Sequence, residues 1–369
     1  MLDGLTHEQQ MLQESTRRFV DEEMLPHEDL VDRDGHVPIE LGRQIELRAK
    51  EIGLFAANLP ENVGGGGLDY TCMAVIEREF GRTSHALHAW VARPTELLLA
   101  TEGAQKEQYL APCVTGAKRE LFALSEPEAG SDIMSMKSNA KRDGDDWILN
   151  GSKHFISGPV MPDFAIVFAA TGHDETPRGS RTRITAFLVD VGMPGFDIQV
   201  GYNCVSYRGY LNFKLDFDNV RLGPDHILGE EGRGLELSGQ WLGMGRIWVG
   251  ATCCGKAERL FEMAKSWAAE RKQFGQAIGK FQATGFKLAD MAVELRAADL
   301  LVKDAISKAD QGVMTDSDAA MVKLYCSEML NRVADNTVQI YGGMGLMDDL
   351  PVQRPVSYTH LRAHETSEN

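Results

Sequence analysis

The segment 121–158 holds the most residues that could carry chemistry. After a short apolar run comes the polar loop SEPEAGSD, which contains the hydroxyls of Ser125 and Ser131. Pro127 fixes one backbone angle in this loop, and Gly130 permits conformations that other residues avoid. The loop is therefore predicted to present hydroxyl and backbone N–H groups to a ligand.

Two dipeptides in the same segment are typical of tight turns between strands. Asp143-Gly144 and Asn150-Gly151 each lie between short β-like runs. Asp-Gly and Asn-Gly strongly favour two-residue hairpin turns. Both are predicted to be hairpins, so this part of the chain is expected to be antiparallel, with its loops at one edge of the sheet.

These residues resemble the signatures of a known family. SEPEAGSD (125–132) resembles the TEP-x-AGSD run of the acyl-CoA dehydrogenase family, and NGSKHFISG (150–158) resembles its NG-x-K-x-W-I-(T/S) run. Further resemblances follow in family order, over roughly Thr6–Arg354. They include the runs PENVGGGGL, AQKEQYL, FDNVRLGPDHILGEEGRG and RKQFGQAIGKFQ. These further matches disfavour the simpler interpretation of 121–158 as ordinary turns of a β-domain.

Composition excludes several classes of protein. The chain has 369 residues and a net charge of -16, which argues against a nucleic-acid binder and against an anionic membrane surface as partner. The sequence shows neither an apolar run long enough for a membrane span nor the features of a signal peptide. No CxxC pair or metal-ligand spacing is present, so we predict no metal site and a cytoplasmic protein with reduced thiols. The cysteines are Cys72, Cys113, Cys204, Cys253, Cys254 and Cys326.

Hydrophobic periodicity divides the chain into three predicted domains. Residues 1–120 are expected to be helical, 121–232 to form strands, and 233–369 to be helical again. Thr6 and Gln9 predict a capped first helix, as Thr315 and Asp318 do for the last one. The predicted helices after the first are Pro38–Ile52, Asp69–Arg82, Ser84–Glu102, 234–270, 278–310 and 317–340. Beyond the hairpins, the predicted strands are Phe164–Ala169, Ile184–Val191, Ile198–Val200 and Leu211–Phe217.

The fold class that follows is α+β. An N-terminal helical domain precedes a middle antiparallel β-barrel or sandwich and a C-terminal domain of the four-helix-bundle type. Only three long helices are visible in that last domain, so its fourth helix is expected to be missing. Residues 355–369 are atypical of the family.

The resemblance implies FAD as cofactor, with two sets of contacts. Phe122, Leu124 and Ser125 fall where the family lines the flavin ring, Phe155 replaces a tryptophan that covers it, and Ser157 matches a residue that bonds the N5 edge. A second set, which the family uses to reach FAD across subunits or at its adenine half, comprises Arg271, Gln273, Phe274, Gln339 and Gly343. A guanidinium suits phosphate because its fork binds two oxygens. Taken alone, Phe155 would be ordinary core and Arg271 a solvated charge at a helix end.

The same resemblance implies acyl-CoA as substrate. Ser131 matches a position near the pantetheine or thioester end, and Arg246 matches a family arginine on the substrate-binding helix; taken alone, Arg246 would be a surface charge. The implied reaction is α,β-dehydrogenation to the trans-2-enoyl-CoA, with electrons passed to an electron-transfer flavoprotein. Family members assemble across subunits, so a homotetramer with a role in fatty acid metabolism is expected.

The catalytic base is the weakest part of the resemblance. One family branch carries a glutamate just before Arg246, where this chain has Gly245. Most members carry it in a C-terminal loop, and that register leads to Glu365. However, PVSYTHLRAH (355–364) does not resemble the family. Either Glu365 is a shifted base, or the residues from Pro355 onward are foreign or frame-shifted sequence, which we favour.

Other functions stay open at this level. They are a flavin oxidase or monooxygenase on the same scaffold, a non-catalytic acyl-CoA/FAD-binding homologue without a base, and a helical scaffold for protein contacts. The residues that set acyl specificity are mostly hidden, and each candidate for the pocket floor has ordinary packing as its simpler interpretation. If Arg93 points inward, a polar or carboxylated acyl tail is expected. The floor candidates are Trp90, Arg93, Trp241 and Trp248.

Overall fold

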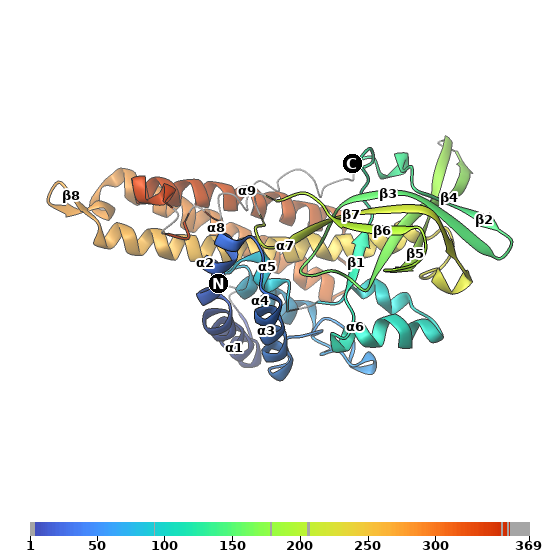
Figure 1. Ribbon diagram of the computed structural model, residues 1–369. Coiled ribbons are helices and arrows are strands. Elements are labelled where there is room, and N and C mark those ends of the chain that lie inside the picture. Colours follow the sequence, from blue (N-terminus) through green and yellow to red (C-terminus); the bar gives the residue numbers. More distant parts are fainter. Residues whose placement is uncertain are drawn as a thin grey trace.

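The computed structural model describes residues 4–91, 93–177, 179–204, 207–347, 350–352 and 354. It has three parts, a helical N-terminal region, a curled sheet and a set of long C-terminal helices (Figure 1). The α-helices of the first part are α1 (His7–Glu23), α2 (Glu28–Asp34), α3 (Ile39–Glu51), α4 (Tyr70–Phe80), α5 (His85–His88) and α6 (Ala111–Thr115).

The ends of these helices follow from local sequence. The Thr6 hydroxyl accepts from the Gln9 N–H at 3.2 Å, while the Gln9 side chain accepts from the Thr6 N–H at 3.0 Å. This reciprocal pair is the predicted capping box, and α1 begins at the next residue. After α3 the chain turns at Gly53, which has a φ of 76° that glycine adopts without strain.

The predicted helix Ser84–Glu102 is wrong. Only α5, four residues long, and a 3₁₀ turn at Glu96–Ala100 form there. Pro94 lies between them; it lacks an N–H and disfavours helical backbone in the residue before it. Apolar spacing alone therefore overestimated the length of this helix.

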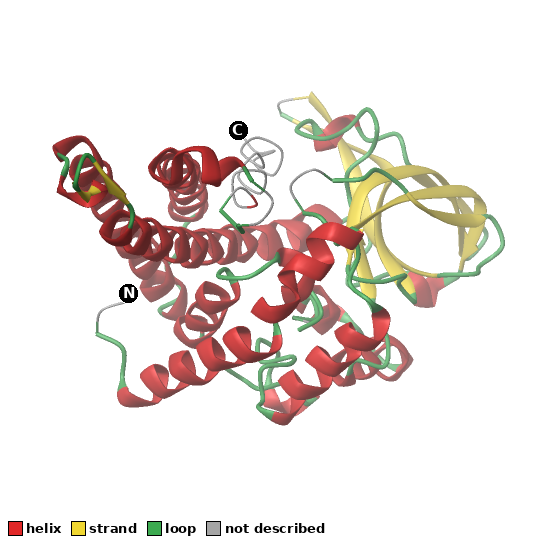
Figure 2. Cartoon of the chain, turned by 60° about the vertical axis from the view of Figure 1, so that its left-hand side comes forward, coloured by secondary structure: helices red, strands yellow, loops and turns green. Residues whose placement is uncertain are grey.

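The middle part is one seven-stranded sheet, curled so that Figure 2 shows it almost end-on as a ring. Its strand order is β1-β4-β2-β3-β7-β6, with β5 paired to β4. Alternate side chains fill the inside of the curl and the face toward the helices. The strands are β1 (Glu120–Ala123), β2 (Asn139–Asp143), β3 (Asp146–Gly158), β4 (Phe164–Thr176), β5 (Gly179–Asp190), β6 (Phe196–Val200) and β7 (Leu211–Leu222).

One of the two predicted hairpins is confirmed and the other is wrong. Asp143 pairs with Asp146 across a turn in which Gly144 has a φ of 66°. Asn150-Gly151 instead lies inside the continuous strand β3, where the register against β7 shifts. The Asn150 side-chain oxygen accepts from the Asn219 N–H at 2.9 Å, so the dipeptide forms a bulge whose side chain replaces a ladder bond.

The expectation of a purely antiparallel sheet also needs correction. β1 pairs with β4 in parallel, with Phe122 opposite Ile166. The β2–β3 hairpin lies between these two strands in the sequence, which supplies the crossover that a parallel pair requires. Dipeptides typical of hairpins predict only the pairing of strands that follow one another in sequence, so they could not predict the parallel pair of β1 and β4.

The C-terminal helices match the predictions closely. They are α7 (Gly234–Glu270), α8 (Gln282–Asp310) and α9 (Asp316–Tyr341), and they run beside one another along the long axis of Figure 1. Thr315 and Asp318 form the expected capping box of α9. A two-stranded hairpin, β8 (Lys272–Gln273) and β9 (Gln276–Ala277), joins α7 to α8. Among the described residues after α9, only a 3₁₀ turn at Gly342–Leu346 is an assigned element of more than one residue.

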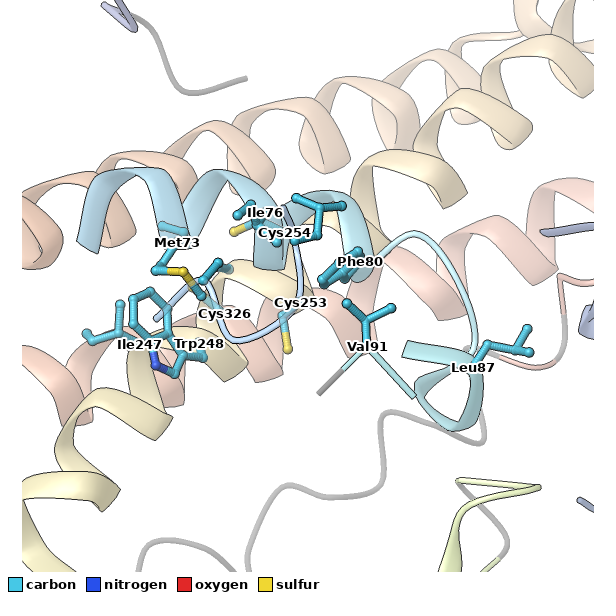
Figure 3. Packing of buried hydrophobic residues seen from close by; sticks show 14 of the residues in the cluster. Met73, Ile76, Phe80, Leu87, Val91, Ile247, Trp248, Cys253, Cys254 and Cys326 are labelled. Atoms are coloured by element: carbon cyan, nitrogen blue, oxygen red, sulfur yellow. The ribbon is translucent and has the colours of Figure 1, made fainter. Parts of the chain in front are cut away.

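Both helical parts share one core. Met73, Ile76 and Phe80 of α4 pack with Trp248 and Cys254 of α7 and with Cys326 of α9 (Figure 3). None of the six cysteines forms a disulfide. No described helix is both long enough and apolar enough to cross a bilayer.

A buried charge network crosses this core. Arg78 of α4 is 1% exposed, and its guanidinium lies 2.8 Å from Glu258 of α7 and 3.1 Å from Asp299 of α8. Arg17 of α1 reaches Glu258 at 2.9 Å and Glu79 at 2.8 Å. A buried charge is tolerated when it is paired and hydrogen-bonded, so this network fixes how α1, α4, α7 and α8 pack.

Glycine permits the close approach of α4 and α7. A Cβ on Gly255 would lie 1.7 Å from the Arg78 carbonyl oxygen, and one on Gly81 would lie 2.2 Å from that of Thr252. These contacts are with backbone, which cannot rotate away. The crossing of these two helices therefore depends on the absence of side chains at both positions.

We expect Gly255→Ala to lower the free energy of unfolding by about 1–3 kcal/mol or more, because overpacking forces the two helices apart. Gly285→Ala is the matched control on α8, where a Cβ meets no heavy atom within 4 Å. It should be neutral or stabilise by up to about 1 kcal/mol through helix propensity. Urea unfolding measures both, and equal stability of the two variants would contradict the proposed close contact.

Candidate active site

The two motif loops meet beside the sheet. Leu124 and Ser125 follow β1, and the Ser125 carbonyl oxygen accepts from the His154 N–H of β3 at 3.1 Å. A buried ion pair reinforces this junction, because Lys153 Nζ lies 2.7 Å from Glu126 Oε1 and donates to the Leu124 carbonyl at 2.9 Å. Segments that are almost 30 residues apart in sequence are thus held together at one edge of the sheet.

The Glu126 carboxylate also holds the far end of its loop. It accepts from the backbone N–H of Lys137 at 2.6 Å and of Ser138 at 3.1 Å. Burial alone would raise the pKa of Glu126, but Lys153 and these N–H donors outweigh it and hold the pKa below its usual value. Burial lowers the pKa of Lys153 to about 8, so the pair is ionised at neutral pH.

Phe155 and Ser157 lie next to this junction on β3. Phe155 has a φ of 55° and is 59% exposed, and its ring lies 5.3 Å from that of Tyr202. Positive φ is rare for a bulky residue and is found where the surrounding structure imposes it. The strand therefore turns an aromatic face outward instead of burying it.

The Ser157 hydroxyl is held by a neighbouring strand. Its Oγ accepts from the Asn212 amide of β7 at 3.2 Å, and the Ser157 carbonyl accepts from the Tyr210 hydroxyl at 3.3 Å. Its own hydroxyl is 3.5 Å from the Phe155 carbonyl, which is a weak contact. Because Asn212 supplies the incoming donor, the hydroxyl hydrogen of Ser157 is available to an acceptor outside the strand.

The remaining residues of the first predicted set face the helices. Phe122 lies on the face of β1 toward α7, with its ring 4.4 Å from that of Trp241 and 5.0 Å from that of Phe168. Leu124 is buried in the core shared with the helices. Ser131, which was predicted for the substrate and not for FAD, is instead exposed in the loop before the turn Ile133–Ser135. Phe122, Leu124, Ser125, Phe155 and Ser157 therefore all belong to β1, β3 and the segment joined to them.

The second predicted set lies at the other end of α7. Arg271 follows the last residue of α7, and Gln273 and Phe274 belong to the β8–β9 hairpin, which Figure 1 places far from the sheet. Phe274 is 95% exposed with a φ of 51°, and Arg271 forms no ion pair within the described part of the chain. An exposed aromatic ring beside an uncompensated guanidinium suits contact with another molecule.

Gln339 and Gly343 join this second set. They flank Tyr341, whose ring stacks on that of Trp267 at 4.7 Å, four residues before Arg271. The helix has 30 residues from Trp241, which contacts Phe122, to Arg271 (271 − 241), so it separates the two sets by about 45 Å at the usual rise per residue. The structure does not bring the two sets together within one chain.

Arg246 lies on α7 between the two sets and is half-buried. No carboxylate among the described residues forms an ion pair with it. The preceding residue is Gly245, where a Cβ would meet no heavy atom within 4 Å. Glu365, the predicted base, lies outside the described residues.

The residues proposed for the pocket floor are mostly packed. Trp90 and Trp248 are each 3% exposed, and Trp241 is half-buried against Phe122. Arg93 points inward, with its Nη1 3.0 Å from Glu77 Oε1 and its guanidinium over the Trp248 ring. This Nη1 makes no hydrogen bond to a described residue, and burial raises the pKa of Glu77 despite the nearby guanidinium, so the expectation of a polar or carboxylated acyl tail stays a prediction.

Sequence reasoning missed three functional candidates. Glu126 and Lys153 belong to the quoted motifs, yet their pairing needs the fold, and the only signal was a lysine among inward-facing strand residues. Asn212 was noticed only as part of a predicted strand. Each of the three positions a residue predicted to contact the flavin and is not itself predicted to contact it.

Models of a single family match almost the entire chain. The N-terminal, middle and C-terminal domain models of acyl-CoA dehydrogenase match residues 6–117, 121–220 and 232–365. The chain belongs to the acyl-CoA dehydrogenase family. Its members are oxidoreductases that act on CH–CH groups and bind FAD.

Relatives in this family share about a third of the sequence. A 3-(aryl)acrylate reductase of Clostridium sporogenes is 34% identical over 354 residues, 95% of this chain and 92% of that protein. The caffeyl-CoA reductase-Etf complex subunit CarC of Acetobacterium woodii is 33% identical over 95% of this chain and 92% of that protein. The human mitochondrial short-chain specific acyl-CoA dehydrogenase is 34% identical over 94% of this chain and 83% of that protein.

Solved acyl-CoA dehydrogenases share the architecture. Butyryl-CoA dehydrogenase from Megasphaera elsdenii superposes with a TM-score of 0.87 at 31% identity, covering 99% of this chain and 95% of that one. An acyl-CoA dehydrogenase from Bacillus anthracis complexed with FAD has a TM-score of 0.88 at 26% identity, covering 98% and 65%. The predicted α+β fold class is confirmed as the acyl-CoA dehydrogenase fold.

We expect Lys153→Met in this member of the acyl-CoA dehydrogenase family to cost about 3–5 kcal/mol of stability, because it leaves the buried Glu126 without its cation. Glu126→Gln should cost a similar amount, and the double variant should cost less than the sum of the two. Arg221→Met is the control, since the exposed pair with Asp146 should be worth less than about 1 kcal/mol. Urea unfolding of all four variants gives the coupling, and additive effects would contradict a cooperative pair.

The same pair predicts a pH dependence. The folded-state pKa of Glu126 lies below its usual 4.5, so its contribution is present above that pH and is lost as pH falls through the folded pKa. For Lys153, the folded pKa of about 8 lies below 10.5, so the unfolded state binds more protons between these values and stability rises with pH there. We therefore measure the free energy of unfolding of wild type and of the double variant from acid to alkaline pH. The difference between the two proteins should rise with pH in both ranges.

Proposed function

We propose that the chain catalyses FAD-dependent α,β-dehydrogenation of an acyl-CoA thioester to the trans-2-enoyl-CoA and passes the electrons to an electron-transfer flavoprotein. The observation that carries this proposal is the junction of the two motif loops. It presents Ser125, Phe155 and Ser157 at one edge of the sheet, with hydroxyl donors beside an outward aromatic ring. Family membership supplies the reaction class.

The residues present fit a flavin. A flavin needs donors at its polar edge, an apolar wall and a cation for its pyrophosphate. The Ser157 hydroxyl, oriented by Asn212, supplies a donor, and Phe155 with Tyr202 supplies the wall. Arg271, uncompensated within the described residues, supplies the cation. Bound there, FAD would accept the hydride from the substrate β-carbon.

On the substrate side, we assign Ser131 and Arg246 to acyl-CoA. The exposed Ser131 hydroxyl can hydrogen-bond the pantetheine or thioester end, and the guanidinium of Arg246 can pair with an anionic group of the substrate. The α-proton is only weakly acidic, so the thioester oxygen must be polarised while a carboxylate removes the proton. We assign this base to Glu365.

The C-terminal family model supports Glu365 only indirectly. Its match extends to residue 365 and so overlaps the segment for which the sequence favours a foreign origin. The competing proposal is a homologue that binds FAD and acyl-CoA but lacks a working base. A flavin oxidase or monooxygenase on the same scaffold is the third possibility, and electron transfer to oxygen distinguishes it.

We infer that the complete site needs a second copy of the chain. The two FAD sets are about 45 Å apart along α7, beyond the reach of one dinucleotide, so Arg271 and Phe274 would complete the site of a neighbour. An exposed apolar stripe on α8 fits such a contact. Phe286, Val293 and Leu300 recur every seven residues and are 64%, 69% and 49% exposed. A homotetramer, as a dimer of dimers, is the proposed assembly.

The proposed electron acceptor rests on a relative. The Acetobacterium woodii protein is by name a subunit of a complex with an electron-transferring flavoprotein. Two of the relatives are named reductases, so the direction of turnover depends on the redox partner and the substrate, whereas the residues of the site serve both directions.

We expect Arg271→Ala to bind FAD at least about tenfold more weakly, because a charge-assisted bond to phosphate is worth about 1.5–3 kcal/mol. Arg221→Ala is the matched control, an exposed arginine paired within the sheet. Flavin absorbance after gel filtration measures retained cofactor. Full retention in Arg271→Ala would reject the assignment of this residue to FAD.

Anaerobic titration of the purified holoprotein with a mixture of saturated acyl-CoAs tests the reaction. We expect the visible flavin band to bleach and to return on addition of an electron-transfer flavoprotein faster than on addition of oxygen. Rapid return with oxygen alone would favour an oxidase. A yellow protein that binds acyl-CoA without bleaching would favour the homologue that lacks a base.

Gly245→Glu tests whether a missing base is the only defect. The open space around this position accommodates a side chain beside Arg246. If wild type does not bleach, this variant should bleach with acyl-CoA, whereas Gly245→Gln, of equal size but without a base, should not. An acyl-CoA-induced spectral shift without bleaching in Gly245→Glu would show that the scaffold lacks more than a carboxylate.

A further inference from the structure

The amide of Asn212 is held at one end only. Asn212 lies opposite Ser157 in the antiparallel pair of β3 and β7, and its Nδ2 donates to Ser157 Oγ at 3.2 Å. Its Oδ1 is buried and finds no hydrogen-bond partner within the described part of the chain. An unsatisfied buried acceptor costs about 1–3 kcal/mol, so its presence beside a residue assigned to the flavin calls for a functional reason.

The unpaired end of this amide lies beside the backbone of Gly201. A Cβ on Gly201 would be 3.5 Å from Asn212 Oδ1 and 3.1 Å from Cγ of Lys214. The Gly201 N–H already donates to the Asn212 carbonyl at 2.6 Å, so it does not serve the side chain. Among the described residues, a second hydrogen bond to Oδ1 therefore does not fix which end of the amide faces Ser157.

The two ends of an asparagine amide have nearly the same shape but opposite hydrogen-bonding character. Nδ2 only donates and Oδ1 only accepts, so a half turn about the last side-chain bond exchanges them while the amide keeps its outline. With Nδ2 toward Ser157, the serine oxygen accepts and its hydrogen can point away from the strand. With Oδ1 toward Ser157, Asn212 takes the serine hydrogen, and Oγ presents a lone pair to the same outer side.

The direction of hydrogen bonding also reverses at the flavin. Under the proposed function, on which this inference rests, Ser157 contacts the N5 edge of FAD. N5 of an oxidised flavin accepts a hydrogen bond, whereas reduction adds two electrons and places a proton on N5, which then donates. If Nδ2 stayed toward Ser157 in the reduced state, the serine hydrogen would keep only the weak 3.5 Å contact with the Phe155 carbonyl.

We propose that Asn212 is a positioning residue whose amide turns over with the redox state of the flavin. In the oxidised state Nδ2 faces Ser157, and the serine hydroxyl donates to N5. In the reduced state Oδ1 faces Ser157, the serine hydroxyl donates to Asn212, and Oγ accepts from N5. Each state then has a complete chain of hydrogen bonds, and Asn212 acts on the cofactor through Ser157.

A double-variant cycle in the flavin midpoint potential tests this chain. Asn212→Asp keeps the size of the side chain but only accepts when ionised, so it holds Ser157 in the arrangement that matches reduced flavin. Its charge also moves the potential, and the same substitution in a Ser157→Ala background measures that effect alone. After subtraction of the charge effect, we expect a tenfold shift toward reduced flavin, which is about 30 mV for two electrons.

The potentials are measured at neutral pH by titration of the holoproteins with sodium dithionite against a reference dye, without any acyl-CoA. Asn212→Leu neither donates nor accepts, so it is the size-matched control, and its effect on the potential should be the same with and without Ser157→Ala. An equal effect of Asn212→Asp in both backgrounds, or a corrected shift toward oxidised flavin, would overturn the proposal. A wild type that retains no FAD contradicts the proposed function as well, whereas bound FAD without this coupling contradicts the role of Asn212 alone.

Neutron diffraction from deuterium-exchanged crystals of the wild-type holoprotein gives a readout that does not depend on any variant. Deuterium scatters strongly, so the two ends of the Asn212 amide are distinguished directly. We expect the nitrogen toward Ser157 in oxidised crystals and the oxygen toward Ser157 after reduction with dithionite. The same orientation in both crystals would show that the amide is a fixed support and would overturn the proposal.

Discussion

The structure depends on the pairing of one buried guanidinium. Arg78 on α4 has no access to water, so it must be neutralised by Glu258 on α7 and Asp299 on α8. A charge buried without such partners would cost several kcal/mol, which excludes alternative packings of these helices. The N-terminal and C-terminal helices therefore form one core, although the whole β-domain separates them in sequence.

Because α7 is fixed in that core, it acts as a rigid spacer. One end packs against the sheet and the Phe122 region, and the other carries Arg271 and Phe274 outward. A helix of this length cannot bend its two ends toward one cofactor. The proposed sharing of the flavin site with a second copy accounts for the separation of the two predicted sets and for the apolar stripe on α8.

The proposed flavin edge is held by polar contacts that never reach the surface. The Glu126–Lys153 pair fixes the motif loop against β3, and Asn212 directs the hydroxyl of Ser157. Such supporting contacts hold the side chains that would touch the flavin in position before the reaction, so no reorganisation energy is spent on orienting them. Phe155 has a strained backbone with positive φ, and these surrounding contacts hold it in that conformation.

Local sequence alone determined the helix caps at Thr6 and Thr315, the extents of the three long helices and the strand-rich middle, because these depend on neighbours a few residues away. The motif resemblance supplied the predicted site residues. The tertiary structure decided the rest. Pro94 broke a helix that spacing predicted, Asn150-Gly151 became a bulge because β3 pairs along β7, and Glu126 met Lys153. Such contacts follow from the packing of distant segments, and no short-range pattern encodes them.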